Sequence, residues 1–272
     1  MPLSLKPTFR DELATASRPL IGMWISSGSP VMAEICAGSG LDWVIIDMEH
    51  GPNDLTSVLA QLQAVAAYPV TPMVRVPIGD AVIIKQVLDL GAQNLLVPMV
   101  SSADEARAVV EAVRYPPRGR RGIGGSLARS ARWNRVDDYL ADADRYVSLF
   151  VQIETAAGVE AAAEIAAVDG VDGVFVGPAD LSASMGLLGQ QSHPDVVAAV
   201  QRIFDAVRGA GVPVGVNAFD PAVAQSYLDA GASFVLVGAD VTLVARGAEG
   251  LAARFGAIPR PELDEGPERA GY

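Results

Sequence analysis

The chain has 272 residues, of which half are hydrophobic and 19% are charged, and its formal net charge is −12. This length suits a single α/β barrel, which typically needs about 250 residues. The acidic balance argues against a nucleic-acid-binding protein, which would carry a basic patch. Because Cys36 is the single cysteine, an intramolecular disulfide and a thiolate metal cluster are both excluded.

The first 18 residues mix charged and apolar side chains and lack the continuous apolar stretch of a signal peptide. No apolar run in the chain approaches the ~20 residues that a helix needs to cross a bilayer. We therefore expect a cytoplasmic enzyme with no membrane partner. One barrel domain is expected over residues 1–257, followed by a flexible tail over 258–272, where Pro, Glu and Gly are frequent.

Eight short apolar runs alternate with longer amphipathic stretches along the chain. Such runs, rich in β-branched residues, are typical of parallel strands that are buried on both faces. The predicted strands are Leu20–Ile25, Trp43–Asp47, Met73–Val76, Asn94–Pro98, Ser148–Ile153, Gly173–Val176, Pro213–Val216 and Phe234–Val237. The predicted helices between them include Asp54–Ala67, Ala103–Val113, Gly158–Ala167, Pro194–Ala210 and Pro221–Ala230.

A strand followed by a helix, repeated about eight times, predicts a closed (β/α)8 barrel of the α/β class, the TIM barrel fold. The alternative is an open doubly wound sheet, which would need a glycine-rich phosphate loop after its first strand. The segment Ser26–Ser29 does not have that pattern, so the closed barrel is favoured.

One connection is longer than the others and carries many arginines. Five arginines lie in the segment from Arg114 to Arg129, both included, and residues 115–144 contain several glycines and prolines. Loops of this length in compact domains are usually functional or disordered. In an acidic protein, a cationic loop at the barrel mouth would attract an anionic substrate. The alternative is a solvated loop or a subunit contact, and the sequence does not separate them.

Polar side chains gather where the predicted strands end, which is where the active site of such a barrel lies. Packing does not explain them, because burying an unpaired charge is costly. The residues at these strand ends are Trp24, Asp47, His50, Arg75, Gln152, Glu154 and Asp180.

Glu154 and Asp180 follow consecutive strands, which lie about 4.8 Å apart in a sheet. Both carboxylates could therefore reach one divalent cation, with water and substrate oxygens as the other ligands. A hard oxygen site of this kind suits Mg²⁺ or Mn²⁺, and Co²⁺ and Zn²⁺ are further candidates. The alternative is that each carboxylate caps the helix that follows it.

His50 lies three residues after Asp47, and an aspartate that accepts from one imidazole nitrogen leaves the other as a base near neutral pH. The guanidinium of Arg75 could bind a carboxylate or a developing enolate oxygen, or pair with a carboxylate at the mouth. Trp24 could form a pocket wall or fill the barrel, and Gln152 points the same way as Glu154 by strand alternation.

The chain contains two lysines, Lys6 and Lys85, and neither follows a predicted strand. Schiff-base aldolases need a desolvated lysine in the pocket. Carbonyl chemistry at this site, if present, would therefore use a metal ion as a Lewis acid.

Long motifs spread over five predicted strands resemble the HpcH/HpaI family of class II pyruvate aldolases. They are Gly22–Trp24, Trp43–Asn53, Pro72–Pro77, Val151–Thr155 and Val174–Ser182, and the stretch Ala128–Arg135 is similar to the 4-hydroxy-2-oxoheptanedioate aldolase branch. The resemblance covers residues 20–256. It implies a hexamer of two trimers on a (β/α)8 barrel, with the last helix exchanged between subunits.

The resemblance also implies a role for each matching residue. The metal ligands are Glu154 and Asp180, and the base with its carboxylate partner is His50 with Asp47. The enolate-stabilising arginine is Arg75. The backbone contacts to the pyruvate carboxylate come from Gly177 and Ala179, and Pro178 between them also binds substrate. Trp24 is the pocket tryptophan, and Gln152 lies beside the metal. The implied reaction is reversible cleavage of a 4-hydroxy-2-oxoacid, such as 4-hydroxy-2-oxoheptanedioate, to pyruvate and an aldehyde such as succinic semialdehyde.

The sequence departs from that branch at Asn217, where the branch carries a leucine on the aldehyde side of the pocket. A 2-keto-3-deoxy sugar acid aldolase of the same family is therefore an alternative. A second alternative is a citrate-lyase-like acyl-CoA lyase, in which the arginines of residues 118–121 would contact phosphates. A third alternative is a barrel that serves only as a binding module. The complete set of polar residues at the strand ends argues against this alternative.

Overall fold

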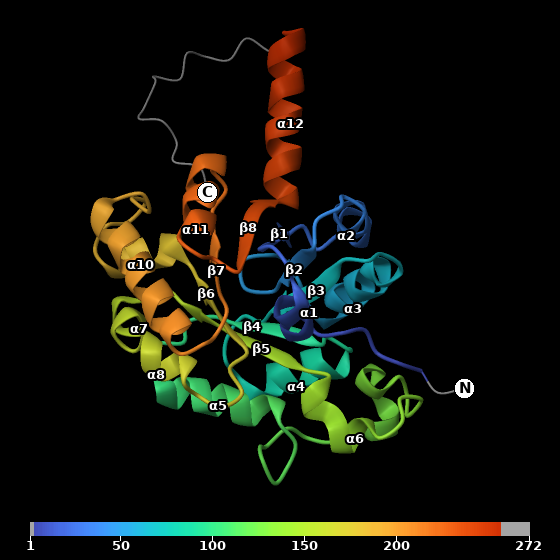
Figure 1. Cartoon of the computed structure of the whole chain (residues 1–272). Coiled ribbons are helices and arrows are strands. Elements are labelled where there is room, and N and C mark those ends of the chain that lie inside the picture. Colours follow the sequence, from blue (N-terminus) through green and yellow to red (C-terminus); the bar gives the residue numbers. More distant parts are fainter. Residues whose placement is uncertain (1–2, 257–272) are drawn as a thin grey trace.

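The computed structural model describes residues 3–256 and contains a closed barrel of eight parallel strands (Figure 1). Each strand pairs with its neighbours in chain order, and β8 pairs with β1 to close the barrel. The strands are β1 Leu20–Ile25, β2 Trp43–Asp47, β3 Thr71–Arg75, β4 Asn94–Val97, β5 Ser148–Ile153, β6 Gly173–Val176, β7 Val214–Asn217 and β8 Phe234–Ala239. The predicted fold class is confirmed, and the open-sheet alternative is wrong.

Helices follow the strands and surround the barrel. They are α1 Phe9–Thr15, α2 Pro30–Ala37, α3 Leu55–Ala64, α4 Ala81–Asp89, α5 Ala103–Val113, α6 Tyr139–Asp142, α7 Ala156–Glu160, α8 Ala162–Ala166, α9 Pro178–Ser184, α10 Pro194–Gly209, α11 Pro221–Asp229 and α12 Asp240–Phe255. Short 3₁₀ turns are η1 Val65–Ala67, η2 Gly125–Leu127, η3 Arg129–Ala131 and η4 Ala143–Arg145. The predicted helix Gly158–Ala167 is divided at Ala161 into α7 and α8.

Most helices begin at a side chain that satisfies free backbone N–H groups of the first turn. Asp80 caps α4, Ser102 caps α5 and Asp220 caps α11, each accepting from backbone N–H groups two or three residues later. Such caps are worth about 1 kcal/mol each. They fix where each helix starts after its strand, and so fix the length of the loops at the barrel mouth.

Aromatic side chains fill the inside of the barrel. Trp43, Phe150 and Phe234 are almost fully buried, and the rings of Trp43 and Phe150 each contact that of Phe234 edge to face. Glycines on neighbouring strands make room for them, because a Cβ at Gly173 would lie 2.1 Å from the Phe150 ring and one at Gly215 would lie 2.3 Å from the Phe234 ring. The interior is therefore a packed core that closes the barrel below the mouth.

Helix α1 was not among the predicted elements and closes the N-terminal end of the barrel. The fully buried Phe9 ring lies 4.9 Å from Trp43, 5.3 Å from Phe150 and 5.4 Å from Phe234, measured between ring centroids. Its backbone N–H donates to Asn94 Oδ1 at 2.7 Å, at the start of β4. The seven-residue helix carries a single buried apolar residue, which is why hydrophobic periodicity did not reveal it.

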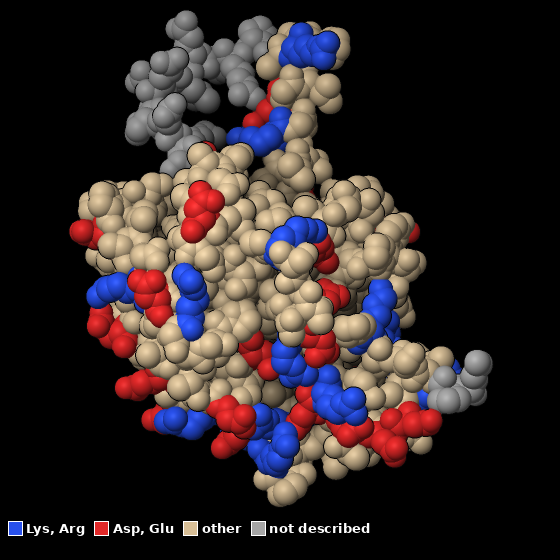
Figure 2. Space-filling view, in the orientation of Figure 1, with Lys and Arg blue, Asp and Glu red and all other residues tan. Residues whose placement is uncertain are grey.

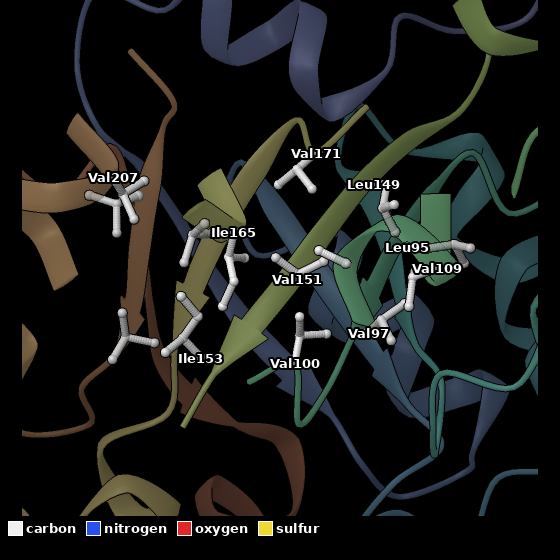
Figure 3. Close-up of a cluster of buried hydrophobic side chains, with 14 of the residues drawn as sticks. Leu95, Val97, Val100, Val109, Leu149, Val151, Ile153, Ile165, Val171 and Val207 are labelled. Atoms are coloured by element: carbon white, nitrogen blue, oxygen red, sulfur yellow. The ribbon is translucent and has the colours of Figure 1, made fainter. Parts of the chain in front are cut away.

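A second apolar core lies between the barrel and its helices. Figure 3 shows part of it, where side chains of β4 and β5 meet those of the surrounding helices. Val97, Val151 and Ile153 are fully buried, as is Ile165 on α8, and Val109 on α5 is almost fully buried. This core holds β5 and β6 in register, with Ile153 opposite Val176, and so fixes the strand ends that carry the predicted site.

The last described helix, α12, stands away from the barrel (Figure 1). Several of its large apolar side chains are exposed, including Leu243, Val244, Leu251 and Phe255. Exposed apolar residues also lie on α2, at Val31 and Ile35. Exposed apolar surface of this kind commonly marks a contact with another protein surface. The predicted tail, residues 258–272, lies outside the described residues, so the domain boundary at 257 stays a prediction.

The arginine-rich connection lies at the N-terminal ends of the strands and not at the mouth of its own barrel, so that prediction is wrong. It follows α5 and precedes β5, and loops from helix to strand lie opposite the active-site face. Its contacts agree, since Arg121 donates to Asp89 at the end of α4 and Arg129 donates to the carbonyl of Leu90. Arg118 pairs with Asp144 within the same connection.

Charges of both signs are interspersed over the face that Figure 2 shows. Among residues 3–256, no helix combines the length and apolar character needed to cross a membrane.

Candidate active site at the mouth of the barrel

A cavity of about 820 Å³ lies at the C-terminal ends of the strands. Ten of the eleven predicted site residues line it: Trp24, Asp47, His50, Arg75, Gln152, Gly177, Pro178, Ala179, Asp180 and Asn217. The eleventh, Glu154, is buried directly behind the wall, where its Oε2 lies 2.8 Å from the position of a Cβ added to Gly177. The structure therefore brings all eleven residues to one site.

Arg75 is almost fully buried and held by two carboxylates and a ring. Its Nε and Nη2 donate to the two Asp47 oxygens, each at 2.8 Å, and its Nη1 lies 2.7 Å from Glu49 Oε2. The guanidinium carbon lies 4.1 Å from the centre of the Trp24 ring. A paired, planar and stacked guanidinium has little rotational freedom, so it presents a fixed positive edge to the cavity.

The expected contact between Asp47 and the His50 imidazole is absent from the described hydrogen bonds, which corrects the predicted pairing. Asp47 Oδ1 instead accepts the backbone N–H groups of Glu49 and His50, in addition to the Arg75 guanidinium. The His50 side chain is 65% exposed, and its Nε2 lies 4.0 Å from Glu49 Oε2. The His50 imidazole therefore lines the open part of the cavity, while Asp47 is buried at its wall.

Among the described residues, neither Glu154 nor Asp180 caps a helix through a side-chain hydrogen bond. Thr155 caps α7, and α9 has no side-chain cap. Glu154 accepts the backbone N–H of Met99 on Oε1 at 2.7 Å and the side-chain amide of Gln152 on Oε2. Asp180 lies in the first turn of α9 and lines the cavity.

The carboxylates of this site repel one another. Burial, together with the charges of Glu49 and Asp180, raises the pKa of Glu154 to about 7 against the opposing effect of the hydrogen bonds from Met99 and Gln152. Burial also raises the pKa of Glu49, against the lowering effect of Arg75. A divalent cation between Glu154 and Asp180 would remove this repulsion.

The donor set at this position fits a hard divalent cation with an incomplete protein shell. Gln152 Oε1 is buried and has no hydrogen-bond partner, and it lies on the side chain that already contacts Glu154. Among residues 3–256, no three acidic, His or Cys side chains are arranged to hold one ion. The protein therefore offers two carboxylates, which leaves coordination positions for water and substrate oxygens.

Two residues of the site were not predicted from the sequence. Glu49 binds the Arg75 guanidinium, and its place between Asp47 and His50 was the available signal. Met99 has a left-handed backbone with φ of 60°, which directs its N–H to Glu154. No side-chain pattern could reveal Met99, because its backbone supplies the contact.

Gly177 and Ala179 have different backbone surroundings. The N–H of Gly177 donates to the carbonyl of Ile153 at 3.3 Å, so it is already used inside the barrel. Ala179 lies in the first turn of α9, where N–H groups have no partner within the helix. On the opposite wall, Trp24 Nε1 donates to Asn217 Oδ1 at 2.8 Å.

The sequence profile of the HpcH/HpaI aldolase/citrate lyase family matches residues 20–247, and the chain belongs to this family. It is therefore an enzyme of the carbon–carbon lyase class, and the predicted family is confirmed.

Individual relatives cover nearly the whole chain. The chain is 53% identical to hydroxypyruvate/pyruvate aldolase of Deinococcus radiodurans over 98% of its length and 97% of that protein. It is also 53% identical to 4-hydroxy-2-oxo-heptane-1,7-dioate aldolase of Salmonella dublin, over 93% of its length and 96% of the relative. A crystal structure of a family member from Burkholderia cenocepacia superposes with a TM-score of 0.87 at 42% identity, covering 91% of this chain and 98% of that one.

Proposed function

We propose that this protein is a divalent-metal-dependent aldolase that reversibly cleaves 4-hydroxy-2-oxoacids to pyruvate and an aldehyde. The observation that carries the proposal is the pairing of two clustered carboxylates, Glu154 and Asp180, with the fixed guanidinium of Arg75 across one cavity. The names of the two relatives, both aldolases, support it. Mg²⁺ or Mn²⁺ suits the two carboxylates, and Co²⁺ and Zn²⁺ are the other candidates.

The residues of the chain have separate roles in this reaction. A divalent cation at Glu154 and Asp180 would act as a Lewis acid toward the keto group. Arg75 stabilises negative charge as it develops on the enolate oxygen, and Asp47 and Glu49 hold the guanidinium in place for that purpose. The exposed His50 imidazole moves a proton to or from the substrate. The N–H of Ala179 binds the pyruvate carboxylate, and Gly177 lets the substrate approach closely.

The proposal is tested with a metal-stripped sample and a panel of 4-hydroxy-2-oxoacids that includes 2-keto-3-deoxy sugar acids. Pyruvate release should be abolished by a chelator and restored by Mg²⁺, Mn²⁺, Co²⁺ or Zn²⁺ added singly. Full activity in excess chelator refutes the metal mechanism. Cleavage of an acyl-CoA thioester in place of the oxoacids would instead support the citrate-lyase-like alternative.

Two variants test the assigned residues. Arg75→Lys and His50→Asn should each lower kcat/KM by roughly two orders of magnitude or more, the usual cost of losing one charge-stabilising or proton-transfer group. Arg202→Lys is the matched control, because Arg202 is exposed and pairs with Glu160 far from the cavity. Near-wild-type turnover in either site variant, with an unchanged circular dichroism spectrum, would contradict its role.

We propose further that the chain assembles as a hexamer in which α12 packs on a neighbouring subunit. The support is the exposed apolar side of α12, at Leu243, Leu251 and Phe255, together with the exposed Val31 and Ile35 of α2. Light scattering coupled to gel filtration should give six times the 28.3 kDa of one chain. The double variant Leu243→Asp/Leu251→Asp should reduce that mass, and an unchanged mass would rule out a contact through α12.

A further inference from the structure

A second cavity of about 460 Å³, here called the side cavity, opens beside the active site. It shares Pro178, Gln191, Asn217 and Phe219 with the main cavity. Its outer wall is formed by Ser226 and Tyr227 of α11, with Ser192 on the loop before α10. A substrate that lies in the active site therefore has space to extend past Asn217 into a second chamber.

The side chain of Asn217 has a fixed orientation between the two cavities. The indole N–H of Trp24 can only donate, so the atom that it contacts at 2.8 Å must be the amide oxygen of Asn217. The amide nitrogen consequently points away from Trp24. Asn217 ends β7 and is half-buried, so this nitrogen is a hydrogen-bond donor at the passage between the cavities.

The side cavity has both polar and apolar walls and contains no cation among its described lining residues. Hydroxyl groups of Ser192, Ser226 and Tyr227 are part of its wall, and burial raises the pKa of Tyr227, so this phenol stays neutral. Its one carboxylate is Asp220, whose Oδ1 accepts the N–H groups of Ala222 and Val223 at the start of α11.

The main cavity does not supply a free cation for the far end of a substrate either. Its one guanidinium, Arg75, is already bound by Asp47 and Glu49. A carboxylate at the distal end of a substrate would therefore lose its hydration on entering the side cavity. There it would meet no described cation and would lie near the carboxylate of Asp220. Such a charge is poorly stabilised there, whereas a hydroxyl group finds both donors and acceptors.

We propose that the side cavity holds the distal part of the acceptor aldehyde and selects neutral, hydroxylated aldehydes over aldehydes that end in a carboxylate. This rests on the proposed aldolase function and names its acceptor class. The chemistry is unchanged: pyruvate C3 loses a proton and bonds to the aldehyde carbon, and the aldehyde oxygen gains a proton. The two 53% identical relatives carry different substrate names, one with a terminal carboxylate, so overall identity does not decide between these classes.

The first experiment compares acceptors that differ in charge. Rates of aldol addition of pyruvate are measured with glyceraldehyde, with succinic semialdehyde and with the methyl ester of succinic semialdehyde. We expect kcat/KM for the ester to exceed that for the acid by about tenfold, the effect of one like charge at about 8 Å and an effective dielectric constant of about 30. Glyceraldehyde should be the best of the three. A preference for the acid over its ester overturns the proposal.

The second experiment places a cation in the side cavity. Ser226→Lys adds an ammonium group at the outer wall, and Ser226→Met is the control of similar length without charge. Ser226→Lys should raise kcat/KM for succinic semialdehyde by about tenfold relative to Ser226→Met and should leave the methyl ester unaffected. Equal effects of the two substitutions on the acid and on the ester would show that the acceptor does not reach this cavity.

A half-reaction separates failure of this inference from failure of the proposed function. Exchange of the pyruvate C3 protons with D₂O, followed by NMR without any aldehyde, reports enolate formation alone. It should be equal in the wild type and in both Ser226 variants. An absence of exchange in the metal-loaded wild type contradicts the aldolase function itself. Normal exchange together with a preference for the charged acceptor overturns the acceptor assignment alone.

Discussion

Replacing Glu154 with glutamine should make the metal-free protein more stable at neutral and alkaline pH. Glu154 is 2% exposed, and its pKa is raised from 4.5 to about 7 by burial and by the neighbouring carboxylates. A carboxyl group whose pKa rises on folding binds its proton more tightly in the folded state. Its contribution to the free energy of unfolding is complete below pH 4.5 and is lost as the pH rises to 7. The difference of about 2.5 pH units corresponds to roughly 3 kcal/mol.

Glutamine fits the same position. Its amide oxygen can accept the N–H of Met99 as Glu154 Oε1 does, and its NH₂ group can donate to Gln152 if the Gln152 amide rotates. That rotation costs little, because Gln152 Oε1 has no partner at present. The substitution therefore removes the buried charge without leaving a new unsatisfied group.

The assay is urea unfolding of both proteins at pH 5 and pH 8 in the presence of a chelator. We expect the variant to gain up to about 3 kcal/mol over the wild type at pH 8 and much less at pH 5. Adding Mn²⁺ at pH 8 should stabilise the wild type and not the variant, because a neutral amide is a poor ligand for a hard cation. A wild type whose stability does not fall between pH 5 and pH 8 in chelator would refute this reasoning.

Three other substitutions have defined outcomes. Phe9→Ala should lower the free energy of unfolding by about 3–5 kcal/mol in urea titrations, because it removes a fully buried ring at the closed end of the barrel; a loss below 1 kcal/mol would contradict its role as a plug. Met99→Gly should raise thermal stability by the equivalent of about 1 kcal/mol, because glycine adopts the φ of 60° without strain; a lowered melting temperature would argue against strain at this residue. Gly177→Ala should weaken Mn²⁺ binding at least about tenfold in calorimetry, since the new Cβ would lie 2.8 Å from Glu154 Oε2; unchanged affinity would place the ion elsewhere.

The sequence allowed the barrel and most strand ends to be predicted, because parallel strands buried on both faces leave continuous apolar runs. It also allowed the site to be located, since a charged side chain at the end of such a run is too costly to bury for packing alone. Strand limits were less accurate at β3, which begins at Thr71 and includes Pro72, and at β8, which runs to Ala239. Backbone hydrogen bonds to the neighbouring strands set those limits, and the pattern of apolar side chains does not reveal where these hydrogen bonds end.

The contacts within the site were harder to predict than its position. Asp47 was expected to hold the His50 imidazole because of their spacing, yet it binds the guanidinium of Arg75, which is distant in sequence. Register between β2 and β3 decides this, because Asp47 and Arg75 are direct neighbours across the two strands. The arginine-rich connection was predicted at the wrong end of the barrel for a related reason. A loop that joins a helix to the next strand lies at the N-terminal end of the barrel whatever its charge.

The plug formed by Phe9 also affects how the chain reaches its native state during synthesis. Phe9 is made well before one of its aromatic partners, Phe234 on the last strand of the barrel. At about 5–20 residues per second, the 225 residues from Arg10 to Phe234 take roughly 10–45 s to make. For that time the N-terminal helix has no complete binding site, so this early segment is docked only when the last strand closes the barrel.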